Sequence, residues 1–155
     1  MYKKILLPLD GSEFAECSIP HVEATAIAQK VPEVVLLRVV EPMSAIAAAG
    51  YAELGGDLLA GVHKKNKDAA QDYLKRIAAR FASKGITAQP VLLEGQPADE
   101  ILRYAEKNGV DLIVMATHGK TGTARWLFGS VAERVARHSK VPVQLIPPAG
   151  CREAQ

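Results

Sequence analysis

The sequence predicts a doubly wound α/β domain, in which helices cover both faces of a five-stranded parallel sheet. Five short apolar runs alternate with four helical patterns, in the order βαβαβαβαβ that is typical of this class. Most of the runs are continuously apolar, as expected of parallel strands that are buried on both faces. Right-handed crossovers then leave few topologies. The expected strands are residues 5–9, 33–40, 86–93, 112–115 and 141–146.

Apolar residues at helical spacing predict the helices between these strands. Pro97 suits the first position of the third helix, and Asp99 and Glu100 suit its first turn. The fourth helix is expected over residues 131–138. The apolar faces of the first three are Ala15, Ile19, Val22 and Ala26; Ala70, Tyr73, Leu74, Ile77 and Phe81; and Ala98, Ile101, Leu102 and Ala105.

Residues 41–63 are rich in Ala and Gly and show no sustained period. We interpret this segment as a flexible surface excursion. The alternative is a lid over a ligand, because the segment leaves the end of the second strand.

Composition places the chain among ordinary globular proteins. Its 155 residues are 48% hydrophobic and 23% charged, which fits one domain over 1–148 followed by a polar tail over 149–155. The net charge of +2 gives no basic field, so neither nucleic acid nor a membrane is expected as the main partner. There is no signal peptide and no apolar run long enough to cross a bilayer, so a cytoplasmic location is expected.

The most informative segment lies between the fourth strand and the last helix. It carries spaced glycines, which let the backbone approach an anion closely, and it leads into a helix N-terminus, where unpaired amides favour negative charge. Lys120 and Arg125 add two cations. A strand, a glycine loop and a helix in this order are typical of a phosphate site.

Two common nucleotide motifs do not fit this loop. A Walker A motif would need glycine at residue 114, which is Val, and the dinucleotide fingerprint would need glycine at Thr117. The spacing that fits is a small residue, two residues, Gly119, nine residues, then Gly129 and Ser130. This pattern resembles the ATP-binding branch of the universal stress protein family.

The resemblance extends over nearly the whole chain. Residues 2–12 resemble the opening strand of the family and residues 141–146 its closing strand. The one departure is Ala116, where the family pattern has its first glycine. Alanine fits there if the backbone is extended, but it would be strained if φ were positive.

The resemblance implies a Rossmann-like fold with strand order 3-2-1-4-5, whose ligand lies at the switch point beyond strands 1 and 4. It also implies ATP as the cofactor, with Asp10 on the ribose, the backbone of Val39 on the adenine edge, and Gly119, Gly129 and Ser130 on the phosphates. The other expected nucleotide contacts are Pro8, Met115, Ala116, His118, Lys120, Gly122, Arg125 and Val131.

Several of these residues have structural alternatives. Asp10 could cap the first helix. Ser130 and Glu133 form a capping box, which is compatible with a phosphate contact. Lys120 and Arg125 could be solvated loop charges. The four histidines show no metal-ligand spacing.

The function expected from the family is therefore a cytoplasmic ATP-binding stress-response protein that acts as a nucleotide-dependent sensor or switch, with Mg²⁺ accompanying the ATP. No hydrolytic apparatus is recognisable, so at most slow hydrolysis is expected. The edge strand 141–146 is expected to pair with a second copy, giving a homodimer. The alternative is a dimeric interaction protein of the same fold that does not use ATP, which Ala116 would favour.

Overall fold

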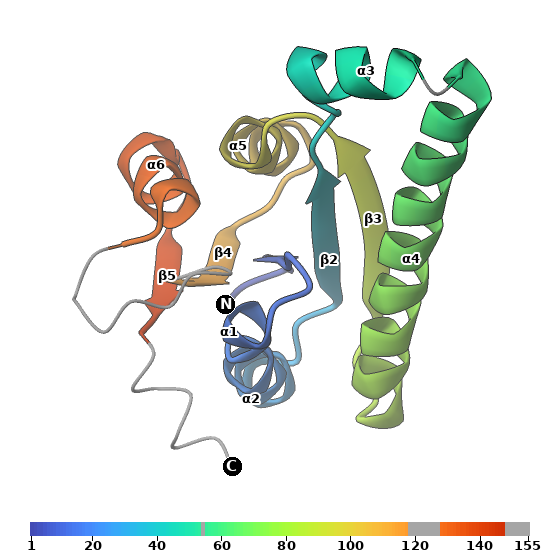
Figure 1. The fold of residues 1–155 in the computed structure, drawn as a ribbon. Coiled ribbons are helices and arrows are strands. Elements are labelled where there is room, and N and C mark those ends of the chain that lie inside the picture. Colours follow the sequence, from blue (N-terminus) through green and yellow to red (C-terminus); the bar gives the residue numbers. More distant parts are fainter. Residues whose placement is uncertain (54, 118–127, 148–155) are drawn as a thin grey trace.

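The computed structural model describes residues 1–53, 55–117 and 128–147 (Figure 1). Its core is one five-stranded sheet, parallel throughout, with the order β3-β2-β1-β4-β5. The predicted fold class and strand order are confirmed. The strands are β1 (Lys4–Pro8), β2 (Glu33–Val40), β3 (Ala88–Glu94), β4 (Leu112–Ala116) and β5 (Val143–Ile146).

Six helices are described, and they cover both faces of the sheet (Figure 1). Helices α2 and α4 pack on one face, and α5 and α6 pack on the other. The helices are α1 (Glu13–Glu16), α2 (Ile19–Gln29), α3 (Ala45–Ala52), α4 (Gly56–Ser83), α5 (Pro97–Lys107) and α6 (Ser130–His138).

The central strand β1 shows why the apolar runs are continuous. Ile5 and Leu7 face the core under α2 and α4, whereas Leu6 faces the core under α5 and α6, and all three are fully buried. Successive side chains of a strand point to opposite faces, so a strand that is covered on both sides needs an apolar residue at every position.

The first predicted helix is wrong in one respect, because the structure divides it into α1 and α2. Pro20 lies in the first turn of α2, where its missing N–H leaves no hydrogen bond unmade. In one continuous helix the same proline would remove an internal hydrogen bond and clash with the preceding turn. The predicted apolar face survives the break: Ala15, Ile19, Val22 and Ala26 are all buried.

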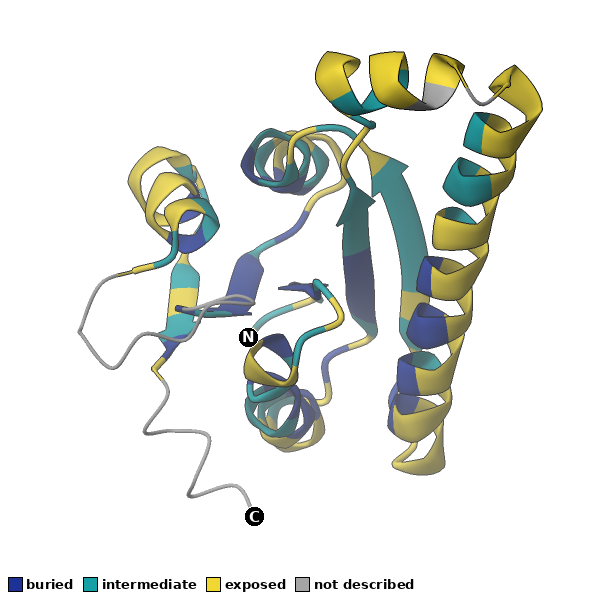
Figure 2. Cartoon of the chain, in the orientation of Figure 1, coloured by how far each residue is buried: buried dark blue, intermediate teal, exposed yellow. Residues whose placement is uncertain are grey.

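Residues 41–63 lie at the surface, as predicted, but the segment expected to be a flexible excursion is largely helical. This segment forms α3 and the first turns of α4, which stand at one end of the sheet (Figure 1). Alanine is the strongest helix former, so the segment becomes helical without an amphipathic period. A regular spacing of apolar residues is not needed because much of this region faces solvent, as Figure 2 shows and as the 88% exposure of Ile46 illustrates.

A buried carboxylate joins α2 to α4. Glu23 has a side chain only 4% exposed, and it accepts hydrogen bonds from Arg80 Nε at 2.8 Å and Lys84 Nζ at 2.5 Å. Burial raises the pKa of Glu23, but the hydrogen bonds from Arg80 and Lys84 outweigh burial and leave the pKa below its ordinary value. The ionised carboxylate therefore stabilises the fold.

Glu23→Gln tests this stabilisation. Because the folded-state pKa of Glu23 is lowered, its contribution is complete above the unfolded-state pKa of about 4.3 and is lost as the pH falls through the folded-state value. Arg80 and Lys84 are 43% and 44% exposed and keep part of their hydration, so the expected loss near neutral pH is modest. We expect about 1–3 kcal/mol in the free energy of unfolding, measured with urea.

The difference between parent and Glu23→Gln should shrink when the same measurement is repeated below about pH 4. Glu106→Gln is the matched control, because Glu106 pairs with Lys140 at an exposed site. Its effect should stay below about 0.5 kcal/mol. A loss for Glu23→Gln that is the same at both pH values would contradict this account.

Candidate functional site

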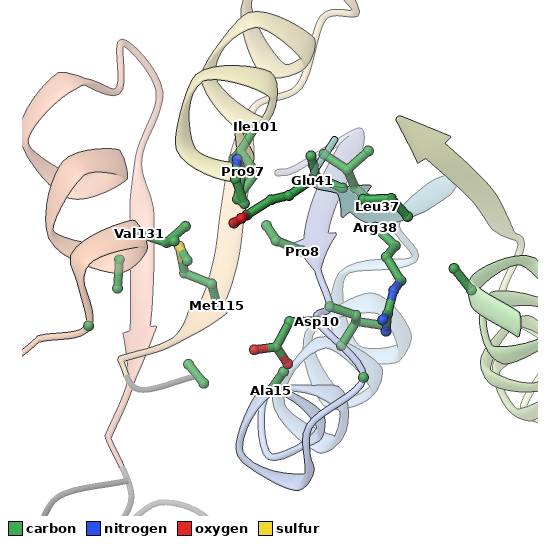
Figure 3. A pocket seen from close by; sticks show the side chains of 18 of the residues that line it. Pro8, Asp10, Ala15, Leu37, Arg38, Glu41, Pro97, Ile101, Met115 and Val131 are labelled. Atoms are coloured by element: carbon green, nitrogen blue, oxygen red, sulfur yellow. The ribbon is translucent and has the colours of Figure 1, made fainter. Parts of the chain in front are cut away.

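A pocket of about 860 Å³ lies beyond the carboxyl ends of β1, β2 and β4 (Figure 3). Its other walls come from the start of α1, the middle of α4, the first turns of α5 and the first turn of α6. This is the switch point of the sheet, because β1 has β2 on one side and β4 on the other. The volume is that of a small-molecule site.

Eight of the thirteen predicted nucleotide contacts line this pocket, although they come from four separate segments. They are Pro8, Asp10, Val39, Met115, Ala116, Gly129, Ser130 and Val131. The other five lie outside the described residues: His118, Gly119, Lys120, Gly122 and Arg125. The expected tail, 149–155, lies outside them as well.

The backbone of Val39 opens into the pocket. The Leu37 C=O accepts from the Leu9 N–H on the β1 side, and the Val40 C=O accepts from the Gly95 N–H on the β3 side. Backbone groups of successive strand residues point to opposite sides, so the N–H and C=O of Val39 face the β1 side. Strand β1 has already ended at Pro8, and no backbone group of the described residues bonds to Val39 there. One donor and one acceptor are thus available to a ligand.

Asp10 is not the helix cap that the alternative interpretation suggested. Ser12 caps α1, since its Oγ accepts from the Ala15 N–H at 3.2 Å. Asp10 supports this cap through one carboxylate oxygen, Oδ1, which accepts from the Ser12 N–H at 2.9 Å and from the Ser12 hydroxyl at 2.5 Å. The second oxygen, Oδ2, accepts none of the hydrogen bonds recorded among the described residues. The carboxylate points into the pocket (Figure 3).

Ala116 adopts ordinary backbone geometry. It is the last residue of β4, and Lys30 is the only non-glycine residue with positive φ in the described part of the chain. The departure from the family pattern therefore causes no strain. Next to it, the buried Thr117 donates its N–H to the Ile146 C=O at 3.0 Å and accepts from the Gly129 N–H at 2.6 Å. This bond holds Gly129 beside the end of β4.

The predicted capping box at Ser130 is wrong. Helix α6 begins at Ser130 with Gly129 as its N-cap, and no side chain of the described residues caps it. The reason is that the Gly129 C=O, one residue earlier than predicted, accepts the first helical hydrogen bond from the Glu133 N–H at 2.9 Å. The uncapped first turn of α6 therefore faces the pocket with its amides, and the helix dipole makes this end positive.

Glu41 lines the pocket although it was not among the predicted nucleotide contacts. It follows β2 directly, and its carboxylate extends into the pocket toward Pro97 (Figure 3). Asp10 and Glu41 thus place negative charge at the ends of β1 and β2, whereas the N-terminus of α6 places positive charge near β4. The pocket therefore has carboxylates at the ends of β1 and β2 and a positive helix end near β4. The signal that could have found Glu41 was its position immediately after a predicted strand.

Arg38 and Tyr73 also line the pocket, and neither was among the predicted nucleotide contacts. The Arg38 guanidinium lies 5.4 Å from the centre of the Tyr73 ring, in cation–π range. Burial raises the pKa of the Tyr73 hydroxyl, and the nearby Glu16 carboxylate raises it further, so the hydroxyl stays protonated. No group of three or more potential ligands that could hold a metal occurs among the described residues, and none of their helices is long and apolar enough to cross a membrane.

Comparison with models of known protein families identifies the family of this chain. The model of the universal stress protein family matches residues 1–147. The chain belongs to the universal stress protein family. Two curated universal stress proteins of Methanocaldococcus jannaschii are similar to it: MJ0531 is 40% identical, covering 94% of this chain and 82% of its own, and MJ0577 is 36% identical, covering 94% and 95%.

Solved structures of universal stress proteins share the fold. The structure of MJ0577 superposes with a TM-score of 0.79 at 35% identity and covers 95% of this chain and 96% of its own. The universal stress protein UspA of Lactobacillus plantarum superposes with a TM-score of 0.70 at 23% identity, over 94% and 97% of the two chains, which shows the fold alone. The family and its fold are therefore established for this chain.

Gly11 tests the geometry of the β1 end. It has φ of +83°, and a Cβ there would lie 2.2 Å from Arg38 Nη1. Gly85 has a similar φ of +75°, but a Cβ there would meet nothing within 4 Å. We expect Gly85→Ala to cost about 1 kcal/mol through backbone strain alone. Gly11→Ala should cost somewhat more, because the Arg38 guanidinium, the far end of a flexible side chain, must also move.

Urea unfolding of the two variants measures the difference. An equal loss of stability would contradict the close packing of Arg38 against Gly11.

Proposed function

We propose that this universal stress protein binds ATP in the pocket at the switch point and acts in the cytoplasm as a nucleotide-dependent sensor or switch, folded as a single domain over 1–148. The observation that carries the proposal is the convergence of three features in one cavity: the open backbone of Val39, the carboxylate of Asp10 and the uncapped first turn of α6. These suit an adenine edge, a ribose and phosphates in turn.

The polarity of the pocket sets the orientation of the nucleotide. The N-terminus of α6 attracts the phosphate chain, whereas at the ends of β1 and β2 the carboxylates of Asp10 and Glu41 outnumber Arg38, the cation of the described lining there. The phosphates therefore lie against Gly129, Ser130 and Val131, and the base and ribose lie at the ends of β1 and β2. Gly119, Lys120 and the remaining predicted loop residues complete the phosphate site in this proposal.

Two further structures with this fold support an adenine nucleotide as the ligand class. One is a universal stress protein in complex with cAMP, at 21% identity, and the other is a universal stress protein of Arabidopsis thaliana with AMP bound, at 15% identity. At these identities they share only the fold with this chain. They support the proposal because two proteins of this fold bind adenine nucleotides.

Magnesium is proposed to accompany the nucleotide. Mg²⁺ in nucleotide sites binds mainly to the substrate phosphates and keeps several waters. The proposed orientation leaves the carboxylates of Asp10 and Glu41 at the base and ribose end. The phosphates would therefore hold the ion, which would neutralise their charge when bound. No general base positioned at the phosphate end is found among the described residues, so we propose at most slow hydrolysis.

Gly129→Lys tests the nucleotide site. A lysine at residue 129 would fill the space beside the first turn of α6, so micromolar binding of Mg-ATP by the parent should weaken at least about tenfold. Isothermal titration of nucleotide-free protein measures this. Gly61→Lys is the matched control, because it adds the same charge at a site in α4 where a Cβ meets nothing within 4 Å.

The control should bind Mg-ATP like the parent. If the nucleotide-free parent shows no binding at millimolar ATP, the proposal fails and the ATP-independent interaction protein becomes the better interpretation. Ala116 gives no steric argument for that second function, because its backbone is extended.

We further propose a homodimer through β5. This strand lies at the edge of the sheet, and it begins at Val143, two residues later than predicted. The C=O groups of Pro142 and Ile146 accept from β4, so the intervening odd-numbered residues direct their backbone groups to the open side. Val143 and Leu145 therefore offer hydrogen bonds to a second copy.

Val143→Pro tests this dimer. Proline removes one N–H from the open edge and leaves the ladder to β4 intact, so the fraction of dimer at high micromolar concentration should fall. Multi-angle light scattering measures the mass. Val143→Ala removes the same side chain but keeps the N–H, and it should remain dimeric. A parent that is monomeric at this concentration would refute the dimer.

A further inference from the structure

An arginine of β2 lies in the pocket beside the wall formed by α4, and it has no ion pair among the described residues. Arg38 leaves the end of β2 and lines the pocket, and no described carboxylate lies within ion-pair distance of it. The undescribed segment 118–127 contains neither Asp nor Glu. At the ends of β1 and β2, Asp10 and Glu41 supply carboxylates and Val39 supplies backbone groups. Arg38 is therefore the cation at that end of the cavity among the described residues.

Tyr73 gives a second, independent sign of an incompletely satisfied group. The residue is only 9% exposed, and its hydroxyl has no hydrogen bond of normal geometry among the described residues, although the Glu16 carboxylate lies close enough to raise its pKa. A buried hydroxyl without a partner costs about 1–3 kcal/mol, so such groups are usually satisfied by a ligand or by water. Tyr73 lines the same wall as Arg38, and Asn66 on α4 adds an amide there.

The position of Arg38 relative to Asp10 indicates what these donors meet. The guanidinium packs directly over Gly11, since a Cβ on Gly11 would lie 2.2 Å from Nη1. Gly11 is the residue after Asp10, so the two α-carbons are about 3.8 Å apart. The proposed function places a ribose at Asp10. Arg38 therefore stands next to the ribose, on the side away from the first turn of α6.

We propose that the pocket accepts an adenine nucleotide carrying a second phosphoryl group on a ribose hydroxyl, bound by the Arg38 guanidinium and the Tyr73 hydroxyl. This inference rests on the proposed function, because Asp10 holds the other ribose hydroxyl. In dinucleotide sites an acidic residue binds a free ribose hydroxyl in one class, and an arginine accommodates a ribose phosphate in the other. This pocket has both kinds of residue beside the proposed ribose. Guanidinium groups suit phosphates because they donate two parallel hydrogen bonds.

The neighbouring carboxylates do not remove this preference. Burial raises the pKa of the Tyr73 hydroxyl most, and the nearby carboxylates of Glu16 and Asp10 raise it further, so the hydroxyl stays protonated. A bound phosphoryl group would compete with Glu16 for its proton. Asp10 is also committed through Oδ1 to Ser12. A free ribose hydroxyl satisfies Asp10 while the phosphoryl group satisfies Arg38 and Tyr73, so both charges gain partners at once.

The test compares the affinities of AMP, adenosine 2′,5′-bisphosphate and adenosine 3′,5′-bisphosphate by isothermal titration of the parent protein. We expect at least one bisphosphate to bind about tenfold more tightly than AMP, the gain of a charge-assisted hydrogen-bond pair. Arg38→Met should abolish this ratio, and Tyr73→Phe, which removes only the hydroxyl, should lower it about threefold or more.

Arg76→Met is the matched control. Arg76 also lies 5.4 Å from the centre of the Tyr73 ring, but it is exposed on α4 and does not line the pocket. The affinity of Arg76→Met for the bisphosphate relative to AMP should equal that of the parent. Titration of AMP in the presence of inorganic phosphate shows whether the second anion must be attached to the ribose. The ribose-phosphate assignment would be refuted if free phosphate tightened AMP binding more than chloride did and the bisphosphates gave no gain over AMP.

The outcomes separate this inference from the proposed function. AMP binding without any preference for a bisphosphate, or a preference that survives Arg38→Met and Tyr73→Phe, would overturn the inference and leave the proposed function standing. If the parent binds neither AMP nor the bisphosphates, the proposed function fails and the inference fails with it.

Discussion

Strand β1 ends before its neighbour β2, and the site depends on this difference in length. The paired register stops at Pro8 opposite Leu37, whereas β2 continues to Val40 along β3. Backbone groups of β2 beyond Leu37 thus lose a partner on one side and become available to a ligand. The chain leaves β1 through Asp10 and Gly11, where positive φ turns it into α1 and brings Asp10 to the cavity. A longer β1 would fill the pocket and satisfy the same groups internally.

Helix α4 is held at both ends, which fixes the wall that carries Tyr73. Near its C-terminus, Arg80 and Lys84 bind the buried Glu23 of α2. Near its N-terminus, Glu94 at the end of β3 accepts from His63 at 3.1 Å and from Lys67 at 2.8 Å. The hydrogen bond from Lys67 lowers the pKa of Glu94, and His63 contributes to the same direction. The pocket wall therefore lies between two ionic anchors on one rigid helix.

Predictability differed between elements for physical reasons. The buried strands and the apolar faces of α4 and α5 could be read from the sequence because burial imposes a period on them. Helix α3 could not, since an exposed alanine-rich helix has no apolar face to reveal it. The break between α1 and α2 was missed because a spacing pattern continues across it, and the N-cap of α6 was placed one residue late because Ser130 is a good cap in isolation.

The sequence by itself determined the fold class, the strand order through family resemblance, and eight residues that meet in the pocket. The fold class follows from local patterns of apolar runs and turn residues. The strand order and the site residues follow from the family resemblance, which the spacing of Gly129 and Ser130 carries. Only the tertiary structure decided that Arg38, Glu41 and Tyr73 share the cavity with Asp10, because they come from β2 and α4 with no motif linking them. The relative lengths of paired strands and the direction of a side chain depend on packing between distant segments, and no local pattern records them.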